Sequence, residues 1–366
     1  MVKAGTGIDL WSESWEGETN EAPLFEDQIV RAVRKTLGMA PGSGQREPAA
    51  VRLPSVEAEE PYLQGRVLLA RSLEDIPLSI PVLEKATRAD PLFAPAHAAL
   101  ATAYVMGLYH GVLSSREEGL RMARQEGARA IELDPNSSEA WATLAMVSSV
   151  FDHDWPAAQR GFRKALELNP SDARAHLQFG MGLLTRARFS EALAHLEQAR
   201  ALDPLSFAAT NYVSVGLYCA GHYDESIAAA RSALSSNPDF AAAHVAIGRG
   251  LALKGDYAGA LSEFARAIQK YGRSPFILGR MGFTLARAGR TKEALDLIPE
   301  IERQHGPAIQ AAFIYAGLGD KRQALDALDR ALADGNIDLN FMAVDPMLAS
   351  LRSEPRFMAL RQRIGL

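Results

Sequence analysis

Apolar residues recur along most of the chain with the spacing of amphipathic helices, in pairs of segments joined by short polar turns. After Pro170, for example, Phe179 and Leu183 lie on one apolar stripe and Leu196 lies on the next. The connecting turns carry glycine and charged residues, as in Lys254-Gly255-Asp256-Tyr257. This pattern predicts a series of helix pairs.

A helix-ending signal divides these pairs at a nearly constant interval. An Asp or Asn followed by Pro occurs at Asp90-Pro91, Asp134-Pro135, Asn169-Pro170, Asp203-Pro204 and Asn237-Pro238. The prolines lie 44, 35, 34 and 34 residues apart, and glycines 272 and 306 stand at the next two places. Proline lacks the backbone N–H and glycine adopts a positive φ, so either residue ends a helix.

Small residues keep the same phase inside these units. When each unit is counted from three residues after its helix-ending Pro or Gly, positions 8 and 20 are small: Gly180, Gly248, Gly282, Ala192, Ala260 and Ala294. Small side chains let two helices approach closely, while large apolar side chains at positions 7, 11 and 24 fill the space to the next unit. Because no unit can bury its own apolar stripe, the units must stack, and the expected fold class is all-α.

This pattern resembles the tetratricopeptide repeat, which has a period of 34 residues, the same small and large positions, and often Trp at position 4, as Trp141 is here. The resemblance covers about residues 60 to 335 and implies a right-handed α-solenoid of stacked antiparallel helix pairs. We expect eight units, which start near Glu60, Ala94, Ser138, Ala173, Phe207, Ala241, Pro275 and His305. The unit at Ala94 carries extra residues around Tyr109–Arg116, and the first helix of the last unit is short.

Four regions are therefore expected: an N-terminal segment (1–37), a Pro/Gly-rich linker (38–59), the repeat array (60–338) and a C-terminal segment (339–366). The C-terminal segment breaks the repeat phase, and we expect it to cap the open end of the stack.

The N-terminal segment has one strand-like stretch, residues 8–15, followed by an amphipathic helix from Leu24 to Leu37. It resembles the end of the TolB-amino-terminal-like α/β domain through Thr6-Gly7, Leu10-Trp11-Ser12-Glu13, Phe25, Asp27-Gln28-Ile29 and Ala32-Val33. In many bacterial regulators this domain precedes a tetratricopeptide array and follows a DNA-binding, Ser/Thr kinase or class III nucleotide cyclase module. The resemblance implies either a truncated regulator or an array that stands alone.

Composition and charge argue against nucleic-acid and membrane binding. The net charge of −5 lies entirely in residues 1–60, which hold 6 Lys+Arg and 11 Asp+Glu, so 33 of each remain in the rest. A neutral body offers no basic face for nucleic acid and no polybasic patch for a membrane surface. No stretch is long and apolar enough to span a bilayer, there is no secretory signal, and the single cysteine fits a reducing compartment, so we expect a cytoplasmic protein.

The sequence offers no constellation for catalysis. It contains no nucleophile elbow, P-loop, H-E-x-x-H or C-x-x-C motif, so we expect no enzyme activity, no cofactor and no metal. We expect His97, His176 and His244, all at position 4, to pack between helices. Asp152-His153-Asp154 has the composition of a metal or acid/base cluster, but an acidic turn over Trp155 explains it as well, and Cys219 is expected to be a buried, inert thiol.

Binding is the function that the array predicts. In tetratricopeptide arrays the first helices line a concave groove, and positions 2, 5, 6, 9 and 12 point into it. These positions give the candidate partner-binding residues Arg174, Gln178, Asn211, Tyr218, Arg249, Arg280 and Phe283. Arginine forks bind carboxylates, so the expected partner is a protein or peptide with acidic groups. We therefore expect a non-enzymatic interaction scaffold. The alternative is the sensory half of a larger transcriptional regulator, kinase or cyclase whose effector module is absent.

Overall fold

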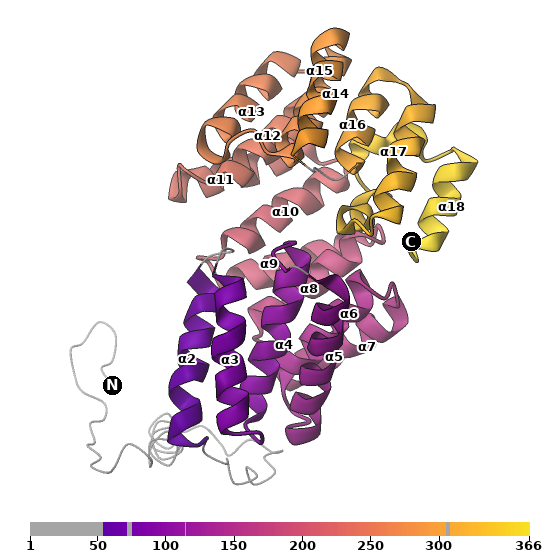
Figure 1. The fold of residues 1–366 in the computed structure, drawn as a ribbon. Coiled ribbons are helices and arrows are strands. Elements are labelled where there is room, and N and C mark those ends of the chain that lie inside the picture. The colour runs from indigo at the N-terminus through magenta and orange to yellow at the C-terminus, as the bar shows by residue number, and fades with distance from the viewer. Residues whose placement is uncertain (1–53, 72–74, 114, 305–307) are drawn as a thin grey trace, which may run out of the picture.

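The computed structural model describes residues 54–71, 75–113, 115–304 and 308–366, and within these ranges all regular structure is helical. Eight helix pairs follow one another, from α2 and α3 to α16 and α17 (Figure 1). The first helices of the pairs are α2 (Val56–Arg71), α4 (Ala94–Tyr109), α6 (Ser138–Val150), α8 (Ala173–Leu184), α10 (Phe207–Cys219), α12 (Ala241–Lys254), α14 (Pro275–Arg287) and α16 (Ile309–Leu318). The second helices are α3 (Ile76–Ala89), α5 (Arg116–Leu133), α7 (Trp155–Leu168), α9 (Phe189–Leu202), α11 (Tyr223–Ser236), α13 (Tyr257–Tyr271), α15 (Thr291–Arg303) and α17 (Lys321–Ala333).

The pairs stack into an α-solenoid, which confirms the predicted fold class. Successive first helices pack against one another, whereas each second helix packs against its own first helix and the first helix of the next pair. The first helices therefore form the inner layer of the stack and the second helices the outer layer. The strand-helix segment predicted at residues 1–37 lies outside the described residues.

The Asx-Pro pairs end the second helices through the Asp or Asn side chain as well as through the proline. Each of these five residues is a C-cap in extended conformation, with φ between −131° and −142°. Its Oδ1 accepts a hydrogen bond of 2.9–3.2 Å from the backbone N–H two residues later. The side chain thus holds the turn that the proline begins, which explains why Asp or Asn precedes proline each time.

Position 4 of the first helix is tied to the same turn. Trp141 Nε1 donates to the carbonyl of Pro135 at 3.0 Å, and His97 and His176 place Nε2 3.2 Å from the carbonyl oxygens of Pro91 and Pro170. A carbonyl oxygen only accepts, so both histidines carry a proton on Nε2. These side chains are structural: they fix the angle at which each pair enters the stack.

Glycine at position 8 gives the close approach that the sequence predicts. A Cβ on Gly180 would lie 2.7 Å from Leu196 Cγ, and one on Gly248 would lie 2.8 Å from Phe264 Cε1. Leu196 and Phe264 are the large residues at position 24 of the same pairs, and both are fully buried. The two helices of a pair are therefore in contact where only a hydrogen fits.

The extra residues of the second unit lengthen its helices. Helix α4 has 16 residues and α5 has 18, whereas α8 and α9 of a regular unit have 12 and 14. Helix α16 has 10 residues, about one turn fewer than α14 with 13. In the part of the chain that the structure describes, no helix is long and apolar enough to cross a membrane.

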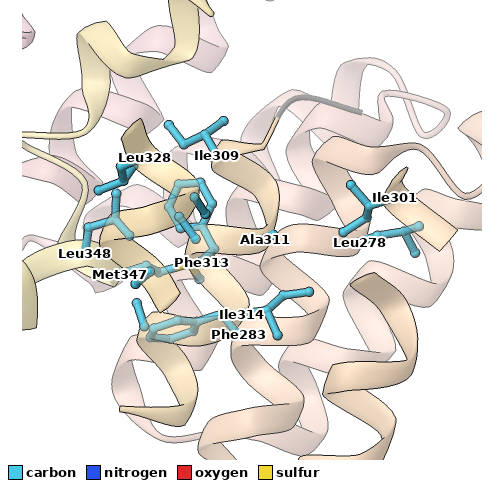
Figure 2. Packing of buried hydrophobic residues seen from close by; sticks show 14 of the residues in the cluster. Leu278, Phe283, Ile301, Ile309, Ala311, Phe313, Ile314, Leu328, Met347 and Leu348 are labelled. Carbon is cyan, nitrogen blue, oxygen red and sulfur yellow. The ribbon is translucent and has the colours of Figure 1, made fainter. Parts of the chain in front are cut away.

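After α17 the chain forms two 3-10 helices, η2 (Ile337–Phe341) and η3 (Pro346–Leu351), and helix α18 (Pro355–Arg363), and from here on the C-terminal segment means residues 335–366. Helix η3 packs on α16 and α17, and α18 packs on α17. Met347 and Leu348 lie in one buried cluster with Phe313 and Leu328 (Figure 2). This part of the segment covers the last pair, where a cap was expected.

Candidate functional site

The first part of the C-terminal segment lies against the inner layer of first helices. The chain turns at Gly335, which has φ +65° and whose carbonyl accepts from Arg116 at the start of α5. Asn340 Nδ2 donates to the carbonyl of Val150 at the end of α6, at 3.4 Å, and the Phe341 ring stacks on Tyr212 of α10 with centroids 6.4 Å apart. Residues 335–345 thus reach from the last pair back to the second, third and fifth pairs. We call them the inner segment.

Two aspartates of the inner segment bind side chains of the first helices. Asp345 Oδ1 accepts from Tyr218 Oη of α10 at 2.8 Å and from its own Met347 N–H at 2.9 Å. Asp338 Oδ2 accepts from Gln310 Nε2 of α16 at 3.1 Å. Burial raises the pKa of Asp338, and the nearby Arg280 and the Gln310 hydrogen bond oppose this only in part. The solenoid thus holds its own chain through carboxylates.

A cavity of about 150 Å³ remains between the inner segment and helices α10, α12, α14 and α16. Its polar wall includes Asn211, Arg249 and Arg280, together with Asp338 and Asp345 of the inner segment. Its apolar wall is formed by Val215, Ala242, Val245, Phe276, Phe313, Phe341 and Met342. The cavity therefore has an apolar wall and a polar wall on which two arginines and two aspartates lie.

Both arginines are nearly inaccessible, Arg249 at 7% and Arg280 at 5% of full exposure. The Arg280 guanidinium lies between the rings of Phe276 and Phe313, 3.9 and 4.3 Å from their centroids, and donates to Gln310 Oε1. Burial lowers the pKa of Arg280 to about 10. The Arg249 guanidinium lies 4.6 Å from the centroid of the Tyr218 ring. Stacking on aromatic rings is a favourable environment for a guanidinium.

The structure brings four of the seven predicted groove residues together. Asn211, Arg249 and Arg280 line the cavity, and Tyr218 lies beneath Arg249. Gln178 lines a separate cavity of about 40 Å³ on the other side of η2, where its Nε2 approaches Met146 Sδ at 3.2 Å. Phe283 is buried in the core cluster beside Ile314 (Figure 2).

Arg174 belongs to a different group on the inner layer of the first pairs. Its Nη2 lies 2.8 Å from Glu139 Oε1 of α6, and Glu139 Oε2 accepts from Arg66 Nη1 of α2 at 2.7 Å. Thr102 donates to Glu139 Oε1 at 3.1 Å. Burial alone would raise the pKa of Glu139, but Arg174, Arg66 and the hydrogen bond from Thr102 have the larger effect. The pKa of Glu139 is therefore lowered, and the carboxylate stays charged.

The sequence interpretation missed two groups of residues at this site. The first group, Asp338, Phe341 and Asp345, lies on the inner segment, outside the repeats. The second group, Tyr109, Tyr212 and Gln310, lies on the first helices. One signal was available: Asp345-Pro346 is a further Asp-Pro pair, and Asp345 accepts from the N–H two residues later as the helix-ending Asp residues do. Asp345-Pro346 differs from the other Asx-Pro pairs because it does not end a helix.

The residues weighed as reactive groups have structural contacts. Asp154 caps α7 by accepting from Ala157 N–H at 3.0 Å, and Asp152 pairs with Arg124. Burial raises the pKa of the Cys219 thiol to about 12, so it remains protonated. Among the described residues, no group of three or more His, Cys, Asp or Glu side chains could hold a metal ion.

The stacked helix pairs and their inner layer define the fold of a tetratricopeptide-repeat solenoid. Residues 216–275 match the family model of the tetratricopeptide repeat, and the pairs on either side repeat the same arrangement. No curated protein matches the chain.

Solved structures with the same fold include a monomeric mutant of IFIT1 with Gppp-AAAA, with 14% identity, TM-score 0.58, and 94% of this chain and 76% of that chain covered. The human IFIT1 dimer with PPP-AAAA has 16% identity, TM-score 0.51, and coverage of 86% and 79%. PilF of Pseudomonas aeruginosa has 20% identity, TM-score 0.44, and coverage of 56% and 91%. At such identities the likeness to the two IFIT1 structures concerns the fold alone.

Proposed function

We propose that this protein is a non-enzymatic scaffold that binds an acidic segment of a partner protein on the inner layer of its first helices. The observation that carries this proposal is the binding of the inner segment to that layer. Asp338 and Asp345 accept hydrogen bonds from Gln310 and Tyr218, two side chains of first helices. The chain therefore contains an example of the ligand: an irregular segment held by its carboxylates.

The partner's first contact is the inner layer of the first pairs, which the inner segment leaves accessible. The side chains of Arg66 and Arg174 are 42% and 36% exposed and flank the single carboxylate of Glu139. Two guanidiniums around one carboxylate leave donors for a second carboxylate. A partner with Asp or Glu side chains satisfies them, as Asp338 and Asp345 satisfy donors in the later pairs.

The predicted groove residues then differ in accessibility. Arg174 lies on the part of the inner layer that the inner segment leaves accessible. Gln178, Asn211, Tyr218, Arg249 and Arg280 are covered by the inner segment and become available to a long partner only when it moves, and Phe283 is buried in the core. Neither part offers a catalytic arrangement, so the proposed activity is binding. The alternative of a regulator's sensory half rests mainly on residues 1–37, which lie outside the described residues, and it stays a prediction.

Site-specific photocrosslinking in the full chain tests this proposal. A crosslinking amino acid at position 66 or 174 is expected to capture one defined partner from source cells, whereas the same group at Lys164, on the outer face of α7, is not. The affinity for that purified partner is then measured by calorimetry. The variants Arg66→Gln and Arg174→Gln are each expected to weaken binding about tenfold, the effect of one lost charge-assisted hydrogen bond.

Lys164→Gln provides the matched control and is expected to leave the affinity unchanged. Equal losses in all three variants would indicate unspecific electrostatic attraction. Crosslinking from position 164 alone would place the partner on the outer face. Either result contradicts the proposal.

A further inference from the structure

The wall of the cavity beneath the inner segment includes a buried arginine, Arg249, whose guanidinium donors are not hydrogen-bonded to the described residues. Arg249 makes no hydrogen bond or ion pair with any residue that the structure describes, and its ring contact is with Tyr218 at 4.6 Å. Its Nε is buried and unbonded, and so is the Nε of Arg280 on the same cavity. Burying a guanidinium without acceptors is costly, so the site as it stands favours an anion.

The carboxylates on the cavity wall are already engaged. Asp345 accepts from Tyr218 and Met347, and Asp338 accepts from Gln310. Both carboxylates attract Arg280 electrostatically, but neither forms an ion pair with Arg249 or Arg280 within the described ranges. Arg280 donates through Nη1 to Gln310 and to the Phe276 carbonyl and keeps its Nε unbonded, whereas Arg249 has no donor bonded to a described residue. An acceptor from outside the chain would satisfy these donors.

The size and lining of the cavity restrict that acceptor. The inner segment forms one wall of the cavity, and the remaining volume of about 150 Å³ is too small for a further chain segment. A cavity of about 150 Å³ lined by apolar side chains can hold a molecule as large as benzene. Besides the arginines, Asn211 and the two aspartates, the wall offers an apolar surface that includes Val245, Phe313 and Met342. A compact apolar body with one anionic group fits both halves of this surface.

We propose that Arg249 and Arg280 form a binding site for a small monocarboxylic acid, which lies beneath the inner segment. The carboxylate accepts from the Arg249 fork and from the free donors of Arg280, and the apolar body packs against Val245 and Phe313. Access is past Phe276, which lines the cavity and is 42% exposed. This site is distinct from the binding of a protein partner and exists while the inner segment is in place.

Benzoate is a suitable probe, measured by calorimetry on the full chain. It is expected to bind at one site. Benzyl alcohol has the same ring without the charge, and inorganic phosphate has charge without the ring, so each is expected to bind at least about tenfold more weakly. Arg249→Gln removes the fork and is expected to weaken benzoate binding at least about tenfold as well.

Arg231→Gln, at an exposed arginine of α11 outside this cavity, is the matched control and is expected to bind benzoate like the wild type. The unliganded Arg249→Gln protein is expected to unfold at the same temperature or higher, because it no longer buries an unpaired charge. Arg249→Lys keeps the charge without the fork and is expected to fall between wild type and Gln.

Three results would overturn the proposal. In the first, benzoate does not bind the wild type, or it binds no more tightly than benzyl alcohol, so the arginines do not select a carboxylate. In the second, phosphate binds as well as benzoate. In the third, folded Arg249→Gln or Arg249→Lys binds benzoate like the wild type.

Discussion

The phenol of Tyr218 donates a 2.8 Å hydrogen bond to the carboxylate of Asp345, a residue 127 positions later in the chain. Both side chains are buried, and Tyr218 lies on a first helix whereas Asp345 lies at the start of η3. Burial and the adjacent carboxylate raise the pKa of Tyr218 well above its ordinary value, so the phenol is a permanent donor. This bond joins the inner segment to the middle of the solenoid.

Replacing Tyr218 with Phe is expected to lower the free energy of unfolding by about 1.5–3 kcal/mol, the range for a hydrogen bond to a charged group. The substitution leaves the N–H of Met347 as the remaining hydrogen-bond donor to the Asp345 carboxylate. Urea denaturation measures the loss, and hydrogen exchange is expected to quicken in residues 337–351. Tyr223→Phe is the matched control: Tyr223 contacts the Tyr218 ring at 6.0 Å, and its hydroxyl makes no hydrogen bond with the described residues. Equal stability of Tyr218→Phe and wild type would contradict this.

The repeat could be predicted from the sequence because its determinants are local. The Asx-Pro turns and the glycines at position 8 act on residues within one unit or between neighbours, so their spacing shows directly in the chain. Phe179 and Leu183 were expected to be large core residues, and both are buried.

The site could not be predicted in the same way. The exposure of Arg249 and Arg280 depends on a segment that breaks the repeat phase and returns over long distances, as the contact from Asn340 to Val150 across 190 residues illustrates. Position in the repeat predicts which way these arginines point. It does not predict what covers them, because non-repeating segments leave no periodic signal.

The Asp203 side chain tests the turn mechanism. Asp203→Ala removes the acceptor for Leu205 N–H and is expected to cost about 0.5–1.5 kcal/mol in the free energy of unfolding. Asp203→Asn keeps the acceptor, as Asn169 and Asn237 do at equivalent turns, and is expected to be nearly neutral. Urea midpoints of the two variants distinguish the cases. If both variants lose equal stability, charge rather than the turn hydrogen bond is responsible.

The close approach of α12 and α13 predicts a large effect of added volume. Gly248→Leu forces its side chain into Phe264 and is expected to cost about 1–3 kcal/mol through overpacking. Ala228→Leu, at an exposed position of α11, adds similar volume in open space and is expected to change stability by less than about 0.5 kcal/mol. Denaturant unfolding of both variants provides the comparison. An unchanged midpoint for Gly248→Leu would mean that the two helices are not in contact there.

His195 makes the stability depend on pH. Burial lowers its pKa below the ordinary value of 6.5, and His176, whose Nδ1 lies 2.9 Å from Nδ1 of His195, lowers it further. The unfolded chain therefore takes up this proton at a higher pH than the folded chain, so stability is fully present above 6.5 and decreases as the pH falls toward the folded pKa. The urea midpoint of the wild type is expected to be lower at about pH 5.5 than at about pH 7.5.

The variant His195→Gln has no imidazole to protonate at this position and is expected to show a smaller decrease in the midpoint. The control His222→Gln, at an exposed side chain, is expected to match the wild type. A decrease of the same size in all three proteins would assign the pH dependence to other groups.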